Sequence, residues 1–90
     1  MKLYQVILAK SDASDDNLYT DAYAPSTNEK VERIRFEEII EAELEEAREE
    51  ADYPDSLEPN QTENYFELKY YRNGASQSVQ VTFKTWDVTL

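Results

Sequence analysis

Two segments of alternating polarity, joined through the only glycine of the chain, constrain the fold more than any other feature of this sequence. Residues 65–72 and 79–84 alternate between apolar and polar side chains, and a period of two places the apolar set on one face of an extended strand. Between them lies Asn73-Gly74, a dipeptide strongly favoured in two-residue hairpin turns. We therefore predict an antiparallel hairpin. Its inward side chains are Phe66, Leu68, Tyr70, Val79, Val81 and Phe83.

The N-terminal part of the chain contains a second pair of candidate strands. Residues 3–9 form a nearly continuous apolar run, as expected for a central strand that is covered on both faces. Residues 11–17 are rich in acids and serine, which predicts a loop. Residues 18–24 include Tyr19 and precede Pro25, so they form a candidate edge strand that returns alongside the first.

Residues 30–52 have the spacing of a long amphipathic helix. Apolar positions recur at intervals of three and four, which line one face at about 3.6 residues per turn. Val31 and Ile34 do not fit this stripe, so the residues before Phe36 form either an extended segment or a kinked first turn. The members of the predicted buried stripe are Phe36, Ile40, Leu44, Ala47 and Ala51.

Both ends of the predicted helix have recognisable signals. Ser26 and Glu29 have the Ser-x-x-Glu spacing of a capping box at the N-terminal end. Pro54 and Pro59 bracket a turn-rich linker, residues 55–64, and proline cannot continue a helix. The helix is therefore expected to end before Tyr53.

These elements predict a single domain of the α+β class. A chain of 90 residues buries only about two thirds of its unfolded surface, too little for two separate cores. The apolar face of an antiparallel sheet needs a covering layer, and the one long helix supplies it. We therefore expect residues 1–90 to form one domain in the order β(β)αββ, a small antiparallel sheet with a long acidic amphipathic helix packed on one face.

The charge is large and unevenly distributed. The chain has 20 acidic and 9 basic residues, a formal net charge of -11, and residues 29–58 alone contain 13 acids and 4 bases. A field of this sign repels nucleic acid and anionic lipid and attracts basic surfaces. We therefore expect a basic partner, and no direct binding to nucleic acid or to a membrane.

Composition also predicts the compartment. Cysteine is absent, so the chain has neither a disulfide framework nor a thiolate metal site, as is usual in a reducing interior. The N-terminal apolar run is followed by acids instead of a signal-peptide cleavage site, and no run approaches the roughly 20 apolar residues of a membrane span. We expect a cytoplasmic protein.

Acidic side chains form a second stripe on the predicted helix, opposite the apolar one, and Arg48 is the only base along it. Like charges at spacing i,i+4 destabilise a helix by about 0.2–0.5 kcal/mol per pair. One interpretation is a solvated face that promotes solubility. The other is imitation of a phosphate backbone, because the acids recur every ~4.5–6 Å along the axis, against ~3.4 Å between charges on one DNA strand. The candidate partner-binding residues are Glu37, Glu38, Glu41, Glu45, Glu49 and Asp52, and Glu46, Glu50 and Asp55 widen the array.

Catalysis and metal binding are not expected. The chain has no histidine for acid–base chemistry at neutral pH, and its single glycine cannot build a phosphate-binding loop. Asp12, Asp15 and Asp16 could offer oxygens to calcium. Their segment lacks the glycine and the closing glutamate of an EF-hand loop, however, so a solvated loop is favoured. We predict no catalytic residue, no metal and no cofactor.

Three aromatic side chains on the polar side of the predicted strands have two interpretations. Tyr65, Tyr71 and Trp86 either form a second structural cluster or anchor a partner or a second copy of the chain. The second interpretation allows a homodimer.

In size, charge and cysteine-free composition the chain resembles the small acidic inhibitors of phages and other mobile elements, namely anti-CRISPR proteins, anti-restriction proteins and nuclease inhibitors that imitate DNA. The resemblance lies most in EEIIEAELEEAREEAD (residues 37–52), and the hairpin FELKYYRNG followed by VQVTFKTW is similar to C-terminal hairpins of some of them. It implies a stoichiometric inhibitor that occupies the nucleic-acid channel or another functional surface of a defence effector, such as a CRISPR complex.

Two other functions fit the same sequence. An acidic adaptor or accessory subunit would assemble through its tyrosine-rich sheet, with the glutamates serving only solubility. An immunity protein would neutralise a basic toxin. The adaptor would bind its partner through the sheet, and the inhibitor through the acidic face of the helix. Salt should therefore weaken binding by the inhibitor more than assembly of the adaptor.

Overall fold

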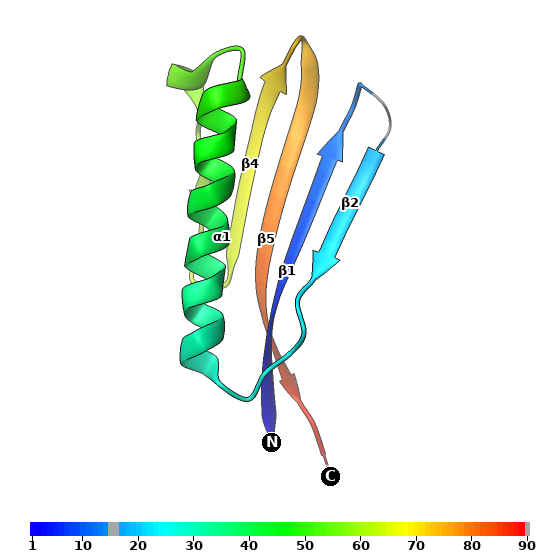
Figure 1. Ribbon diagram of the computed structural model, residues 1–90, viewed down its shortest axis with the longest axis vertical. Coiled ribbons are helices and arrows are strands. Elements are labelled where there is room, and N and C mark those ends of the chain that lie inside the picture. The colour runs from blue at the N-terminus through cyan, green and yellow to red at the C-terminus, as the bar shows by residue number, and fades with distance from the viewer. Residues whose placement is uncertain (15–16, 90) are drawn as a thin grey trace.

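The computed structural model describes residues 1–14 and 17–89, and within them a long helix lies on one face of a five-stranded antiparallel sheet (Figure 1). The strand order is β2-β1-β5-β4-β3, and each neighbouring pair is antiparallel. The predicted α+β class is confirmed. The elements are β1 Lys2–Asp12, β2 Asn17–Ala22, α1 Glu29–Glu50, a 3-10 turn η1 Pro54–Ser56, β3 Asn60–Gln61, β4 Tyr65–Arg72 and β5 Ala75–Asp87.

The β4–β5 hairpin confirms the prediction from alternation. Asn73 and Gly74 have φ angles of 52° and 78°, the two left-handed conformations that the favoured two-residue hairpin turn requires. The six side chains predicted to point inward are all buried. Asn60–Gln61, in the segment predicted as a linker, adds the short edge strand β3 alongside β4.

The N-terminal strands are longer than the apolar run that predicts them. β1 pairs with β5 without interruption from Lys2 opposite Asp87 to Asp12 opposite Gln77, because β5 offers a partner for every residue over that length. Asp12 therefore ends a strand, although the sequence predicted a loop there. β2 is an edge strand as expected and pairs with the second half of β1.

Helix α1 begins at Glu29 and continues without a break through Phe36, which excludes the extended alternative for residues 30–35. The predicted capping box is wrong. The N-cap is Asn28, whose Oδ1 accepts from the Val31 amide at 3.1 Å, while the Ser26 Oγ accepts from the Asn28 amide at 3.0 Å. Asparagine is as good an N-cap as serine, and the Ser26 hydroxyl instead closes the turn that leads into it.

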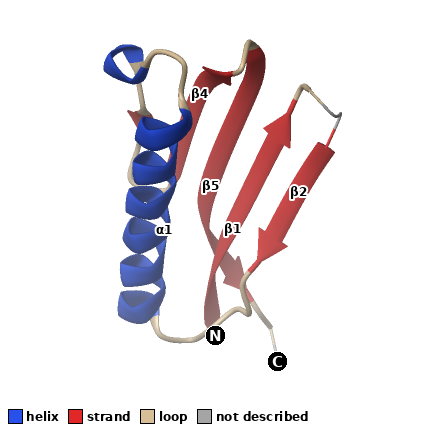
Figure 2. Ribbon diagram, turned by 45° about the horizontal axis from the view of Figure 1, so that its top comes forward, coloured by secondary structure: helices blue, strands red, loops and turns tan. Residues whose placement is uncertain are grey.

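The core lies between α1 and the face of the sheet that α1 covers, and Figure 2 shows the two as separate layers. Phe36, Ile40 and Ala47 are buried, and Leu44 and Ala51 are partly buried against the same core. Phe36 meets Phe83 of β5 edge to face, with 6.0 Å between ring centroids. The predicted buried stripe is therefore the one that packs on the sheet.

Candidate partner-binding surface

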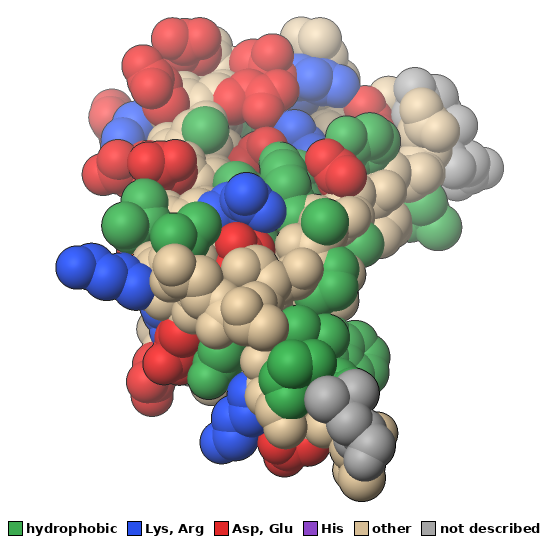
Figure 3. Space-filling model, turned by 60° about the horizontal axis from the view of Figure 1, so that its bottom comes forward, with side chains coloured by type: hydrophobic (Ala, Val, Ile, Leu, Met, Phe, Trp, Pro, Cys, Tyr) green, Lys and Arg blue, Asp and Glu red, His purple; other side chains and the backbone are tan. Residues whose placement is uncertain are grey.

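The glutamates predicted to bind a partner lie on the solvent side of α1. Glu37, Glu38, Glu41, Glu45 and Glu49 are all exposed. Four of them recur at intervals of three, four and four residues on the side opposite the core, over ~16 Å of helix axis. Figure 3 shows acidic side chains gathered over this part of the molecule. We call these four residues the outer acidic line: Glu38, Glu41, Glu45 and Glu49.

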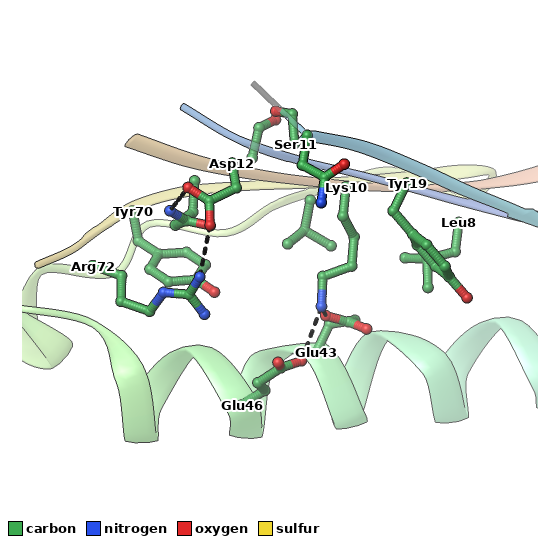
Figure 4. Close-up of a pocket in the computed structure, with 13 residues that line it drawn as sticks. Leu8, Lys10, Ser11, Asp12, Tyr19, Glu43, Glu46, Tyr70 and Arg72 are labelled. Carbon is green, nitrogen blue, oxygen red and sulfur yellow. Dashed lines mark hydrogen bonds and ion pairs between the residues drawn. The ribbon is translucent and has the colours of Figure 1, made fainter. Parts of the chain in front are cut away.

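A second group of glutamates on α1 is neutralised by bases from the sheet. Lys10 Nζ of β1 lies 2.9 Å from Glu43 Oε2 and 3.0 Å from Glu46 Oε2 (Figure 4). Arg72 of β4 donates to Glu50 at 2.8 Å. The expectation that Glu46 and Glu50 widen the free acidic array is therefore wrong, because both face bases that lie far away in the sequence.

The outer acidic line lacks this compensation. Among the ion pairs of residues 1–14 and 17–89, none involves Glu38, Glu41, Glu45 or Glu49. Arg48, between Glu45 and Glu49 in sequence, is exposed and forms no ion pair within the same residues. Glu37, at the edge of the line, accepts a hydrogen bond from Gln61 Nε2 at 3.4 Å. The helix thus separates paired carboxylates on one flank from unpaired ones on its solvent side.

The paired flank borders a groove of about 450 Å³ between α1 and the β1–β2 side of the sheet. Burial raises the pKa of Glu43, against the opposing effect of the Lys10 ammonium. The hydrogen bond from Lys10 lowers the pKa of Glu46. Lys10 of β1 pairs with two acids of α1, and Arg72 of β4 pairs with Glu50 of α1 and Asp12 of β1, so this network fastens the helix to the sheet.

Asp12 belongs to the same network and is not free for a cation. Its carboxylate accepts from Ser14 Oγ and N, from Gln77 Nε2 at 2.8 Å and from Arg72 Nη2 at 2.7 Å. These donors hold the pKa of Asp12 well below its usual range, with the Ser14 hydroxyl contributing most. Asp15 and Asp16 lie outside the described residues. Within the described ones, no group of three or more metal-ligating side chains is assembled.

Asp52 has a structural role that no local sequence pattern indicates. The helix ends at Glu50, two residues earlier than predicted, and Asp52 follows its C-cap residue. Its two carboxylate oxygens accept from the Asn73 amide at 2.8 Å and the Gly74 amide at 2.9 Å. Asp52 therefore ties the end of α1 to the hairpin turn, although it remains exposed.

The three aromatic residues singled out in the sequence share the outer face of the sheet but do not form one cluster. Tyr71 pairs with Ser76 beside the hairpin turn, whereas Trp86 lies ten residues further along β5, ~33 Å away along an extended strand. Trp86 Nε1 donates to Gln5 Oε1 at 2.9 Å, and the Lys84 ammonium lies 4.1 Å from the centre of its ring.

The outer sheet face differs from α1 in its charge. On β1, β2 and β5, the described positions that point away from α1 contain no acid and one base, Lys84. In a chain of net charge -11, this face is close to neutral. The strongly acidic and the near-neutral surfaces therefore lie on opposite sides of the molecule.

Among the described residues, no helix combines the length and apolar character needed to cross a bilayer. Comparison with known proteins finds no matching protein-family model, no significantly similar curated protein and no significantly similar solved structure.

Proposed function

We propose that this protein is a non-catalytic inhibitor that binds a nucleic-acid-handling protein, such as a CRISPR effector or another phage-defence nuclease, through the outer acidic line. The observation that supports this most is the division of the α1 carboxylates. Glu43, Glu46 and Glu50 each pair with a base of the sheet, whereas no ion pair among the described residues involves the outer acidic line.

This division favours binding over simple solubility. Charges that serve solubility need no common face, and mixed signs on a helix are less repulsive than like charges at i,i+4. Here Glu41, Glu45 and Glu49 repeat at that spacing on one side. Lys10 and Arg72 of the sheet pair with the α1 carboxylates that face them, whereas among the described residues the carboxylates on the solvent side of α1 stay unpaired. The negative field of that side is therefore available to a basic surface.

A protein built to hold a phosphate backbone offers such a surface. Its lysines and arginines meet charges every few ångströms and release counterions when they bind. A row of carboxylates spaced by ~4.5–6 Å on a preformed helix presents a similar charge density without the entropy loss of ordering a flexible chain. The expected location is the cytoplasm of the cell in which the target protein acts.

A second function is favoured by the near-neutral outer sheet face. An adaptor or accessory subunit would assemble through β1, β2 and β5 without bringing carboxylates together. Introducing acids there, as in the double variant Thr20→Glu and Gln80→Glu, would then abolish assembly, because both residues are exposed on that face. The inhibitor function predicts that this variant binds its partner normally.

The test uses two triple charge reversals of equal size. Glu41, Glu45 and Glu49 are changed to lysine in one variant. The exposed acids Glu58, Glu63 and Asp87, which lie away from the outer acidic line, are changed to lysine in the other. A partner captured from bacterial lysate and identified by salt-gradient elution is then assayed for DNA binding in the presence of each protein. We expect the first variant to lose inhibition by orders of magnitude and the second to retain most of it.

Equal loss in both triple variants would mean that only net charge matters. Full inhibition by the Glu41, Glu45 and Glu49 variant would remove the outer acidic line from the interface.

A further inference from the structure

The first two turns of α1 bury a carboxylate and expose two apolar side chains. Glu32 is 1% exposed, whereas Val31 is 46% and Ile34 51% exposed. Position 32 precedes Phe36 by four residues, so it continues the buried stripe, and positions 31 and 34 necessarily point outward. Burying a charge has a desolvation cost that an apolar residue at position 32 would avoid, whereas the two apolar side chains at positions 31 and 34 are left in solvent.

The buried Glu32 is held by a local contact. Its Oε1 lies 3.2 Å from Arg35 Nη1, and the Arg35 guanidinium lies over the ring of Tyr23 at 5.2 Å. Arg33 stacks on Phe83 at 3.6 Å and donates to the Glu63 carbonyl and to Asn64. Arg33 is therefore held against β5, and Arg35 against Tyr23, which follows β2.

Val31 and Ile34 lie in line with the outer acidic line. Ile34 precedes Glu38 by four residues and Glu41 by seven, so it shares their face of the helix, and Val31 lies one turn before it. The solvent side of α1 is thus one ridge, apolar at its N-terminal end and acidic along the rest. We call Val31 and Ile34 the apolar end.

Resting on the proposed function, we infer that the apolar end anchors the same partner, whose surface carries an apolar depression beside its basic groups. Charge complementarity supports a basic occupant, because Glu38 and Glu41 adjoin the apolar end. Arg33 and Arg35 contact Phe83 and Tyr23, which leaves the exposed Lys30 as the one base beside the apolar end in the first two turns of α1. Charged rims mainly set the association rate, whereas desolvated apolar anchors mainly set the dissociation rate. The acids steer the partner, and Val31 and Ile34 hold it.

Two synthetic helical peptides serve as probes for this inference. They have the same length and number of lysines, and one has a leucine face that is replaced by serine in the other. A surface that recognises charge alone binds the two peptides equally. The ridge should bind the leucine peptide at least about tenfold more tightly than the serine peptide. The binding constants and dissociation rates are measured by surface plasmon resonance.

The double variant Val31→Ser and Ile34→Ser should lose the preference for the leucine peptide and keep its affinity for the serine peptide. The control is Leu18→Ser and Tyr53→Ser, which removes two side chains that are 81% and 69% exposed elsewhere. This control should keep the preference. Circular dichroism verifies that each variant folds.

The outcomes separate this inference from the proposed function. A preference that survives in the Val31 and Ile34 variant, or is lost equally in the control, overturns the inference and leaves the acidic surface in place. If the affinity for the serine peptide does not change when Glu41, Glu45 and Glu49 are reversed to lysine, the proposed function is contradicted instead. A wild-type dimer in sedimentation that dissociates in the Val31 and Ile34 variant would assign the apolar end to a second copy, against the inference.

Discussion

Among individual residues, Asp12 shows how a carboxylate in an acidic chain can be structural. It stands at the end of β1, opposite Gln77 of β5, and receives donors from its own turn, from β5 and from Arg72 of β4. The same arginine also binds Glu50 of α1. One carboxylate therefore connects three strands, and through Arg72 it connects them to the helix.

Asp12→Asn should destabilise the fold in a pH-dependent way. The folded protein lowers the pKa of Asp12 below the ordinary value of 3.8, so its stabilisation is fully present above that value and is lost as the pH falls toward the folded pKa. Urea midpoints of wild type and variant should thus differ at pH 7, and the difference should begin to narrow only as the pH falls below the ordinary value of 3.8. Asp55→Asn is the matched exposed control. An equal gap at pH 7 and at the lowest accessible pH would contradict this role of Asp12.

Among the elements, those specified by neighbouring residues were predicted correctly. The β4–β5 hairpin follows from alternation and from Asn73-Gly74, and the buried face of α1 follows from the spacing of Phe36, Ile40 and Ala47. Both signals are local, because a period of two or 3.6 residues can be recognised within a single segment of the sequence.

Features that depend on distant segments were missed. Lys10 and Glu43 are 33 positions apart and meet only because α1 lies across β1 at one particular place. For the same reason, the pairing of Asp52 with the hairpin turn had no local signal. The burial of Glu32 did have one, since extending the Phe36–Ile40 spacing back by four residues reaches it.

The orientation of α1 is tested by three alanine substitutions on successive parts of its surface. Ile40 is 2% exposed, so Ile40→Ala should cost about 2–5 kcal/mol of unfolding free energy. Leu44 is only partly buried at the edge of the contact, so Leu44→Ala should cost less, and Glu41→Ala on the solvent side should cost about 0.5 kcal/mol or less. Chemical denaturation gives all three values. Comparable losses at Ile40 and Glu41 would mean that the helix is turned differently.

For the whole molecule, charge and shape reinforce each other. The protein measures 49 × 25 × 16 Å, and α1 runs along its long axis (Figure 1). The outer acidic line therefore extends along one side, while the sheet turns a near-neutral face to the other. A basic partner meets a directed field rather than a uniform one, which favours one orientation of approach.

The salt dependence expected for this surface follows from its exposure. Added salt shortens the Debye length from ~10 Å at 0.1 M to ~3 Å at 1 M. Exposed charges such as those of the outer acidic line are screened by salt, whereas buried ion pairs are screened much less. Contacts by the apolar end persist as salt rises. Affinity should therefore fall steeply at first and then level off.

The most direct measurement is competition by duplex DNA for the partner protein. A preformed complex is titrated with DNA of unrelated sequence at constant salt, and release of the labelled protein is followed by fluorescence anisotropy. If Glu38, Glu41, Glu45 and Glu49 imitate a phosphate backbone, DNA displaces the protein, and the concentration required falls sharply when Glu41, Glu45 and Glu49 are changed to lysine. A complex that withstands saturating DNA, with unchanged affinity in that variant, would contradict nucleic-acid imitation.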